Sequence, residues 1–220
     1  MRELRPGLWH WEAPHPDWRD GEPWDPVVSS YASDGGGRLL LFDPMTLPSE
    51  LDALAADRES AVVLTCPWHE RATESLAERL GVPVYTPLPD TAEYLMQTYG
   101  LTAEQAGDGS PDLIWLLKEG KGDARAYAAG DRLPVGVEAF PGQKPNDMVL
   151  WIEGHGAVIA GDTLVDFGDG LQINPRWLSP AVTRERVAEG LRPLLERPVE
   201  HVLATHGGPF GRDALERALS

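Results

Sequence analysis

Hydrophobic residues along this chain occur in short runs that glycine- and proline-rich turns separate. Runs of roughly four to eight such residues with turn signals on both sides are typical of β-strands. They predict strands at 7–14, 27–32, 38–43, 61–64, 82–85, 124–129, 135–140, 148–153, 157–164 and 202–204. Apolar stripes at helical spacing predict helices that begin at Ser49 and Ser179, and helices at 72–80 and 212–219. Each half of the chain is therefore mostly sheet, which favours two sheets packed face to face with helices outside.

Polar residues follow three of these runs, where a strand is expected to end. The run at 157–164 reads Ala-Val-Ile-Ala-Gly-Asp-Thr-Leu, so Asp162 stands directly after a buried strand and a glycine turn. The stretch 65–71, Thr-Cys-Pro-Trp-His-Glu-Arg, follows a second strand, and His206 follows a third. A carboxylate in such a place has to be paired or has to line a site. We therefore expect Asp162, His206 and the 65–71 stretch to converge at one edge of the sheets.

Other stretches indicate structure more than chemistry. The glycines at 35–37 join two predicted strands, so they predict a hairpin and not a phosphate-binding loop, which needs a following helix. The sequence has no Gly-x-Ser-x-Gly, so nothing supports a serine hydrolase. His155, in a Gly-His-Gly turn, is expected to be exposed and far from the site. Residues 88–122 are irregular and predict a lid-like insertion, with helices at 91–99 and 111–118.

Composition indicates a folded chain with an acidic surface. Of its 220 residues, 42% are hydrophobic, so a single domain over 1–220 can bury a core. The formal net charge is -16, from 35 Asp and Glu against 19 Lys and Arg. This charge repels nucleic acids and anionic membranes, so we expect a small-molecule ligand or substrate; a locally basic pocket is not excluded. The 1 cysteine, Cys66, forms no internal disulfide, and the first residues contain no apolar segment, so we expect a cytoplasmic protein.

Five landmarks in chain order resemble the metallo-β-lactamase superfamily. They are Leu-Phe-Asp-Pro at 41–44, a loop at 65–71 in the place of Thr-His-x-His-x-Asp-His, Gly-Gln at 142–143 in the place of Gly-His, Gly-Asp-Thr at 161–163 and His-Gly at 206–207. The resemblance covers nearly the whole chain. It implies an α+β fold, a four-layer αβ/βα sandwich in which two mixed β-sheets pack face to face with helices on both outer sides. It also implies a two-metal hydrolytic site between the sheets.

The residues at the ligand positions depart from that resemblance. In chain order they are Cys66, Trp68, Glu70, Arg71, Gln143, Asp162 and His206. Only Asp162 and His206 are the residues that the resemblance implies. Zinc catalysis needs about three protein ligands and an open position, and Trp68 cannot ligate. The resemblance therefore implies the fold and does not by itself imply the family's chemistry.

The first hypothesis is a protein that has lost most of its metal ligands and binds a small ligand or a partner. Arg71 would replace a metal ion, with charge-assisted hydrogen bonds to Asp162, to Glu70 or to both. The working residues of the pocket would then be Asp162, His206, Glu70 and Arg71. We expect no cofactor on this hypothesis, and well under one zinc per chain.

Two other hypotheses use the same loop differently. A shifted loop would direct His69 inward, so that His69, Glu70, Asp162 and His206 hold one zinc or similar divalent ion in an atypical hydrolase. Alternatively, Cys66 would be a thiol nucleophile with His69 beside it. Metal analysis separates the first two hypotheses, and replacement of Cys66 tests the third.

Overall fold

The structure is a computed structural model that describes residues 1–107, 109, 123–174, 176–180 and 182–220. Its strands are β1 (Arg2–Arg5), β2 (Leu8–Pro14), β3 (Val27–Gly35), β4 (Arg38–Phe42), β5 (Glu59–Val63), β6 (Val84–Thr86), β7 (Ala124–Ala126), β8 (Arg132–Leu133), β9 (Val137–Pro141), β10 (Met148–Ile152), β11 (Ala157–Ile159), β12 (Leu164–Val165), β13 (Gln172–Ile173), β14 (His201–Leu203) and β15 (Pro209–Phe210). Its α-helices are α1 (Ser49–Ala56), α2 (Thr73–Leu80), α3 (Ala92–Tyr99), α4 (Ala103–Ala106), α6 (Arg184–Leu191) and α7 (Arg212–Ala218). Four short 3₁₀ turns complete the elements: η1 (Pro67–His69), η2 (Pro134–Gly136), η3 (Glu153–His155) and η4 (Arg192–Glu196).

Two mixed sheets contain nearly all of these strands. In the first sheet the order is β1-β2-β3-β4-β5-β6-β7, antiparallel as far as β4 and parallel from β4 to β7. In the second it is β15-β14-β11-β10-β9-β8, where only β11 and β14 run parallel among the described strands. β12 and β13 form a small separate hairpin. Parallel neighbours bring their carboxyl ends to the same sheet edge, and ligands gather there in such folds.

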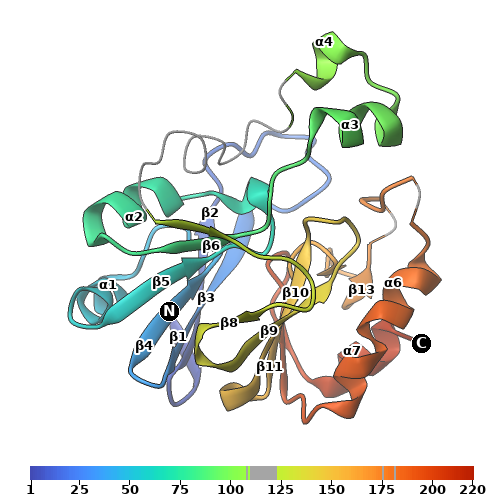
Figure 1. The fold of residues 1–220 in the computed structure, drawn as a ribbon. Coiled ribbons are helices and arrows are strands. Elements are labelled where there is room, and N and C mark those ends of the chain that lie inside the picture. Colours follow the sequence, from blue (N-terminus) through green and yellow to red (C-terminus); the bar gives the residue numbers. More distant parts are fainter. Residues whose placement is uncertain (108, 110–122, 175, 181) are drawn as a thin grey trace.

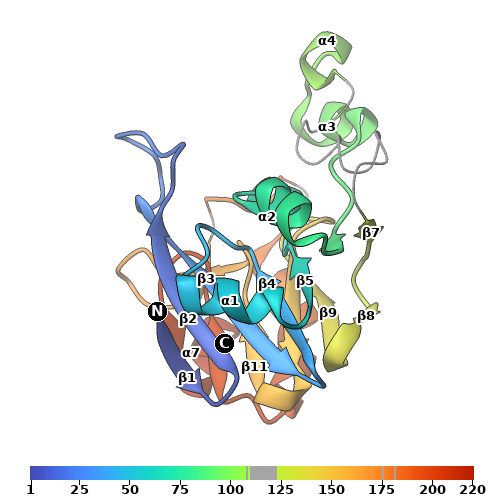
Figure 2. The same ribbon diagram turned by 90° about the vertical axis from the view of Figure 1, so that its left-hand side faces the viewer.

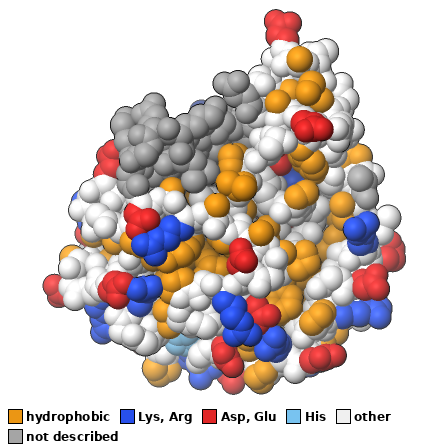
Figure 3. Space-filling model, viewed as in Figure 1, with side chains coloured by type: hydrophobic (Ala, Val, Ile, Leu, Met, Phe, Trp, Pro, Cys, Tyr) orange, Lys and Arg blue, Asp and Glu red, His pale blue; other side chains and the backbone are white. Residues whose placement is uncertain are grey.

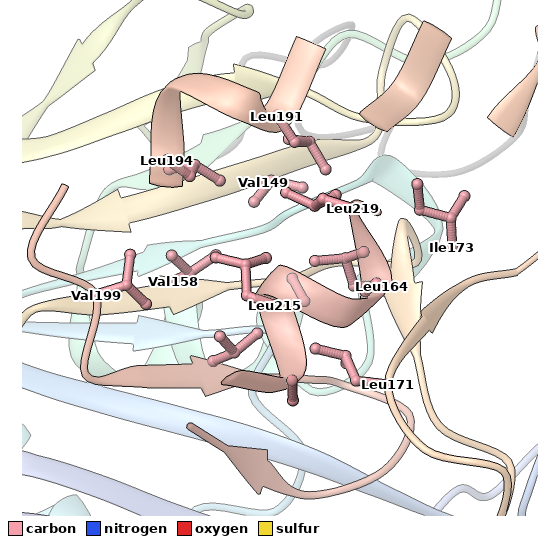
Figure 4. Packing of buried hydrophobic residues seen from close by; sticks show 14 of the residues in the cluster. Val149, Val158, Leu164, Leu171, Ile173, Leu191, Leu194, Val199, Leu215 and Leu219 are labelled. Carbon is pink, nitrogen blue, oxygen red and sulfur yellow. The ribbon is translucent and has the colours of Figure 1, made fainter. Parts of the chain in front are cut away.

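Three apolar clusters join four layers. One cluster lies between the sheets, one between the first sheet and α1 and α2, and one between the second sheet and α6 and α7. Figures 1 and 2 show the two pairs of helices on opposite outer sides. In Figure 4, Leu191 and Leu215 reach from α6 and α7 onto Val149 and Val158 of the second sheet. The predicted four-layer αβ/βα sandwich is therefore confirmed.

The alternation of side chains along β4 shows why this sequence forms a layered sheet. Leu39 and Leu41 pack toward α1 and α2, whereas Leu40 and Phe42 belong to the cluster between the sheets. All four side chains are fully buried, because both faces of the strand are covered. The continuous hydrophobic run at 38–43 is thus the sequence of a strand with two apolar sides.

Three local predictions are wrong. The strand expected at 157–164 is interrupted, because β11 ends at Ile159 and β12 begins at Leu164 in a separate hairpin. The helix expected to begin at Ser179 begins after Thr183, whose Oγ1 accepts the backbone N–H of Arg186 at 3.3 Å. Ser179 instead lies with its Oγ 3.3 Å from the hydroxyl of Tyr94. His155 is buried and not exposed, because its Nε2 lies 3.3 Å from the carbonyl oxygen of Asp34 in the neighbouring turn.

Part of the 88–122 stretch is helical and projects from one end of the sandwich. Figures 1 and 2 both show α3 and α4 above the sheet edge. Thr91 caps α3 by accepting the N–H of Tyr94 at 3.1 Å, so the helix expected at 91–99 is present. The helix expected at 111–118 lies outside the described residues, and the lid-like role stays a prediction. No helix among the described residues combines the length and the apolar character needed to cross a membrane.

Candidate functional site

The site forms at one edge of the two sheets, where Asp162, His206 and the 65–71 loop meet. His69 ends η1 after β5, Asp162 follows β11, and His206 follows β14. The Oδ1 atom of Asp162 lies 3.1 Å from Nε2 of His69 and 3.4 Å from Nε2 of His206. All three side chains are buried. The predicted convergence of these strand ends is therefore present.

Asp43 orients His69 from beneath. Its Oδ1 accepts the backbone N–H of Thr65 at 2.8 Å, and its Oδ2 accepts the Thr65 hydroxyl at 2.6 Å. The same Oδ2 lies 3.1 Å from Nδ1 of His69, so the far nitrogen, Nε2, is the one that faces Asp162. Burial alone would raise the pKa of the Asp43 carboxyl, but His69 and Arg71 outweigh it and lower that pKa.

The charge of His69 depends on the two carboxylates around it. Burial alone would lower the pKa of its imidazole, but Asp162 and Asp43 outweigh burial and raise that pKa to about 9. Burial alone would raise the pKa of the Asp162 carboxyl, but His69, with a contribution from His206, outweighs burial and holds that pKa well below its usual value. Without a metal ion, His69 is thus a cation between two anions at neutral pH.

One oxygen of Asp162 is fixed by the protein, and the other is not. Oδ2 accepts the indole N–H of Trp68 at 2.6 Å, and the backbone carbonyl of Asp162 accepts the side-chain amide of Gln143 at 2.9 Å. Oδ1 is buried and has no hydrogen-bond partner of acceptable geometry, and the same holds for Nδ1 of His206. Buried polar atoms are normally satisfied, so this pair indicates a binding position.

The donor atoms around this position fit a single metal ion. Cys66, His69 and Asp162 each offer a ligand atom, and the three atoms lie within 4.8 Å of one another. Two nitrogen or oxygen ligands of a tetrahedral zinc lie about 3.4 Å apart when each bond is about 2.0–2.1 Å. The distances of 3.1 and 3.4 Å from Asp162 Oδ1 to the two imidazoles match that spacing. A second-sphere carboxylate on the other ring nitrogen, here Asp43, is the usual arrangement for a metal-binding histidine.

Arg71 does not take the place of a metal. Its Nη1 donates to the carbonyl oxygens of Ser29 at 3.0 Å and Asp43 at 2.8 Å. The predicted hydrogen bond from Arg71 to Asp162 is therefore wrong, and the alternative hydrogen bond to Glu70 stays a prediction. The backbone of Arg71 has a φ of 47°, in the left-handed region that residues other than glycine seldom adopt. The guanidinium thereby ties the loop to the ends of β3 and β4.

Cys66, and not Glu70, belongs to the group of potential metal ligands. Glu70 is half-buried and lies outside the group of three potential ligands, and its role in the site stays a prediction. Cys66 is fully buried and belongs to that group. Burial, followed by the carboxylates of Asp162 and Asp147, raises the pKa of the Cys66 thiol, which disfavours a free thiolate nucleophile.

Aromatic residues that the sequence analysis did not select surround His206. The rings of Trp24, Trp177 and Phe167 lie 5.6, 5.2 and 6.0 Å from its imidazole. Trp24 and Trp177 also line a cavity of about 210 Å³, which His69 and Asp162 line as well. His15 lines the same cavity, edge-on to Trp24 at 4.9 Å. These residues come from loops without periodicity, and only the richness in tryptophan, 8 in the chain, gave a signal.

Comparison with known proteins identifies the fold and nothing finer. No protein-family model matches this sequence. A search of curated proteins likewise finds no match. Solved structures do match over nearly the whole chain, and those described next are metallo-β-lactamase family or superfamily proteins or share their fold.

Three of these structures illustrate the likeness. A metallo-β-lactamase family protein from Thermus thermophilus is 19% identical, with 98% of this chain and 78% of that chain covered and a TM-score of 0.60. An archaeal metallo-β-lactamase superfamily protein from Sulfolobus tokodaii is 15% identical over 97% and 84% of the two chains, with a TM-score of 0.64. A third protein, solved in a di-iron-bound form, is 23% identical over 90% and 95%, with a TM-score of 0.57. The chain therefore has the metallo-β-lactamase fold.

Proposed function

We propose that this protein is an atypical hydrolase that holds one divalent metal ion, with zinc as the expected ion. The single observation that carries the proposal is the arrangement around Asp162 Oδ1, a buried oxygen that accepts no hydrogen bond of acceptable geometry and has two imidazole nitrogens at 3.1 and 3.4 Å. Cys66, His69 and Asp162 would hold the ion. This is the one-metal hypothesis of the sequence analysis with Cys66 in the position there given to Glu70.

The surrounding residues suit such a site. Asp43 would keep the lone pair of His69 Nε2 directed at the ion, and Trp68 would hold Asp162 Oδ2, which leaves Oδ1 as the ligand atom. Three protein ligands leave a position open, as catalytic zinc sites require. A metal ion so bound supplies Lewis acidity, which activates water and polarises a carbonyl oxygen. The open position would face the cavity of about 210 Å³.

His206 has a separate part in this proposal. Its Nε2 lies 3.4 Å from Asp162, its Nδ1 is unpartnered, and its ring lines the cavity. It can complete the ligand set or hold and move a proton at the substrate. The tryptophans around it would limit access of bulk water. A cytoplasmic location is part of the proposal, because Cys66 has to stay reduced to serve as a ligand.

Metal stoichiometry tests this proposal. Protein purified without chelator should contain about one zinc per chain by elemental analysis, and His69→Ala and Cys66→Ser should each lower that content to near zero. Trp24→Phe is the matched control and should leave the zinc content unchanged, since Trp24 lines the same cavity and offers no ligand atom. A wild-type protein that stays free of metal after dialysis against zinc would contradict the proposal.

A metal-free binding protein is the second candidate, and one observation favours it. His69 lies 3.1 Å from a carboxylate oxygen on each side, so an imidazolium can supply the positive charge that a metal would bring. This retains the first hypothesis of the sequence analysis with His69 in place of Arg71. The protein would then bind a small ligand in the aromatic cavity without hydrolysing it. Absence of zinc together with saturable ligand binding would select this candidate.

A further inference from the structure

A groove next to the candidate site carries positive charge, although the chain as a whole is strongly acidic. One cavity of about 350 Å³ shares Asp162 and Trp68 with the site and is also lined by Lys144 and Arg176. A larger cavity of about 520 Å³ adjoins it through Lys144 and adds Arg186. The chain has a net charge of -16, so three cations in two adjoining cavities give this region a charge of the opposite sign.

These three cations form no ion pairs with acidic side chains of the described residues. Among the described residues, the side chains of Lys144, Arg176 and Arg186 form no ion pair, whereas most other surface arginines do. Lys144 is half-buried and lies with its Nζ 4.3 Å from the centre of the Trp68 ring. The ring holds the ammonium group at the boundary between the groove and the site. Figure 3 shows charges of both signs scattered over one face, so local arrangement decides which ligands are attracted.

The larger cavity supplies an apolar wall. Val182, Val187 and Pro141 line it, and so does Tyr94 of α3, whose hydroxyl lies 3.3 Å from that of Ser179. A pocket with an apolar wall and a few placed cations suits a small molecule with an apolar body and an anionic group. Of the charged residues that line the smaller cavity, Lys144 and Arg176 attract that anionic group and Asp162 repels it, which favours a position next to the two cations.

We infer that this groove binds organic anions, in which a carboxylate, sulfonate or phosphate group meets Lys144 and Arg176 and the apolar body lies along α6. As a statement about the substrate class, the inference rests on the proposed hydrolytic function. As a binding site, it stands without that function, because none of its cations belongs to the candidate metal ligands. An anion so placed extends toward Asp162 and His206 through the shared wall at Trp68.

A pair of fluorescent probes that differ in one charged group tests the inference. 8-Anilinonaphthalene-1-sulfonate carries a sulfonate, and N-phenyl-1-naphthylamine has the same aromatic body without it. Lys144→Gln combined with Arg176→Gln should weaken binding of the sulfonate probe about tenfold and that of the neutral probe less than about twofold. The control is Arg217→Gln, an exposed arginine of α7 that pairs with Asp213 and lines none of these cavities. It should change neither affinity by more than about twofold.

Several outcomes would overturn the inference. They are no binding of the sulfonate probe, equal losses for both probes in the double variant, or an equal loss in Arg217→Gln. The dependence on salt gives a second readout. NaCl should lower the affinity of the sulfonate probe for the wild-type protein more than its affinity for the double variant. Both titrations are run on protein of measured zinc content, before and after chelator. If the sulfonate probe is preferred and the protein holds no zinc, the anion-binding groove stands and the proposed hydrolase is rejected. If the protein holds zinc and neither probe is preferred, the hydrolase stands and the groove is rejected.

Discussion

At the scale of single residues, the site depends on two strained backbone positions. Asp43 and Arg71 have φ angles of 44° and 47°, in the left-handed region that residues other than glycine seldom adopt. Each such residue costs roughly 1–3 kcal/mol, and the surrounding structure has to hold it in place. Thr65 holds the Asp43 carboxylate by two hydrogen bonds, and Arg71 is tied to the carbonyl of Asp43. The residues that orient His69 are thus the ones that hold the strain.

Thr65→Val should destabilise the protein by about 1–3 kcal/mol, because it leaves a buried oxygen of Asp43 without its hydroxyl donor at nearly unchanged volume. The measurement is the free energy of unfolding from denaturant titration. Thr73→Val is a matched control, since Thr73 is equally buried but its Oγ1 has no hydrogen-bond partner among the described residues. That change should be neutral or stabilising. Equal losses in the two variants would show that the Thr65–Asp43 bond contributes nothing.

His10 gives a prediction for acid pH. Burial lowers the pKa of His10; Glu12 opposes this effect, and the charges of Arg2 and the N-terminus add smaller contributions in the direction of burial. The unfolded chain therefore binds a proton at His10 more readily than the folded chain does. The stability that neutral His10 contributes to the folded protein is lost as the pH falls below about 6.5. The free energy of unfolding should drop between about pH 7.5 and 5.5, and less in His10→Gln. The same drop in both proteins would assign the acid sensitivity to other groups.

The sequence predicted only part of the site at this scale. It predicted that Asp162, His206 and the 65–71 loop lie together in the site, because each follows an apolar strand. It left open whether Arg71 or His69 faces Asp162, because the backbone conformation of the loop, with a left-handed residue at Arg71, cannot be read from the residue pattern. Nor did it mark Trp177 or Trp24, since their positions over His206 depend on loop packing.

At the scale of elements, strands and helices follow the hydrophobic pattern closely. The run at 38–43 became β4, and the closing stripe at 212–219 became α7, because burial on defined faces fixes both. The start of α6 was missed, since Ser179 and Thr183 are both suitable caps and the contact of Ser179 with Tyr94 decides between them. Boundaries that depend on such contacts cannot be read from local sequence.

Leu215→Ala should cost about 2–5 kcal/mol, because Leu215 of α7 is fully buried in the cluster against the second sheet and its removal leaves a cavity. Thermal or denaturant unfolding measures the loss. The matched control is Leu88→Ala, at a leucine that is 59% exposed, where we expect a change within about 0.5 kcal/mol. A small effect at Leu215 would mean that α7 packs less tightly than the structure indicates.

At the scale of the whole molecule, the net negative charge destabilises the folded state. With 35 acidic and 19 basic side chains, like charges repel across the surface, and salt screens this repulsion. Raising NaCl from about 20 to about 300 mM should therefore raise the melting temperature. KCl at equal ionic strength should give the same rise, because screening depends on ionic strength. A fall in melting temperature would show that attractive ion pairs outweigh the net repulsion.

The two halves of the site come from different sheets, and each sheet is a separate stretch of sequence. β1 to β7 lie within residues 2–126, with Asp43 and His69, whereas β8 to β15 lie within 132–210, with Asp162 and His206. A ribosome therefore completes the first sheet before it has made Asp162 or His206. Until then the nascent chain exposes the apolar inner face of that sheet, and His69 has only Asp43 beside it. The period of synthesis between these two stretches is when the chain is most exposed to aggregation and most in need of a chaperone.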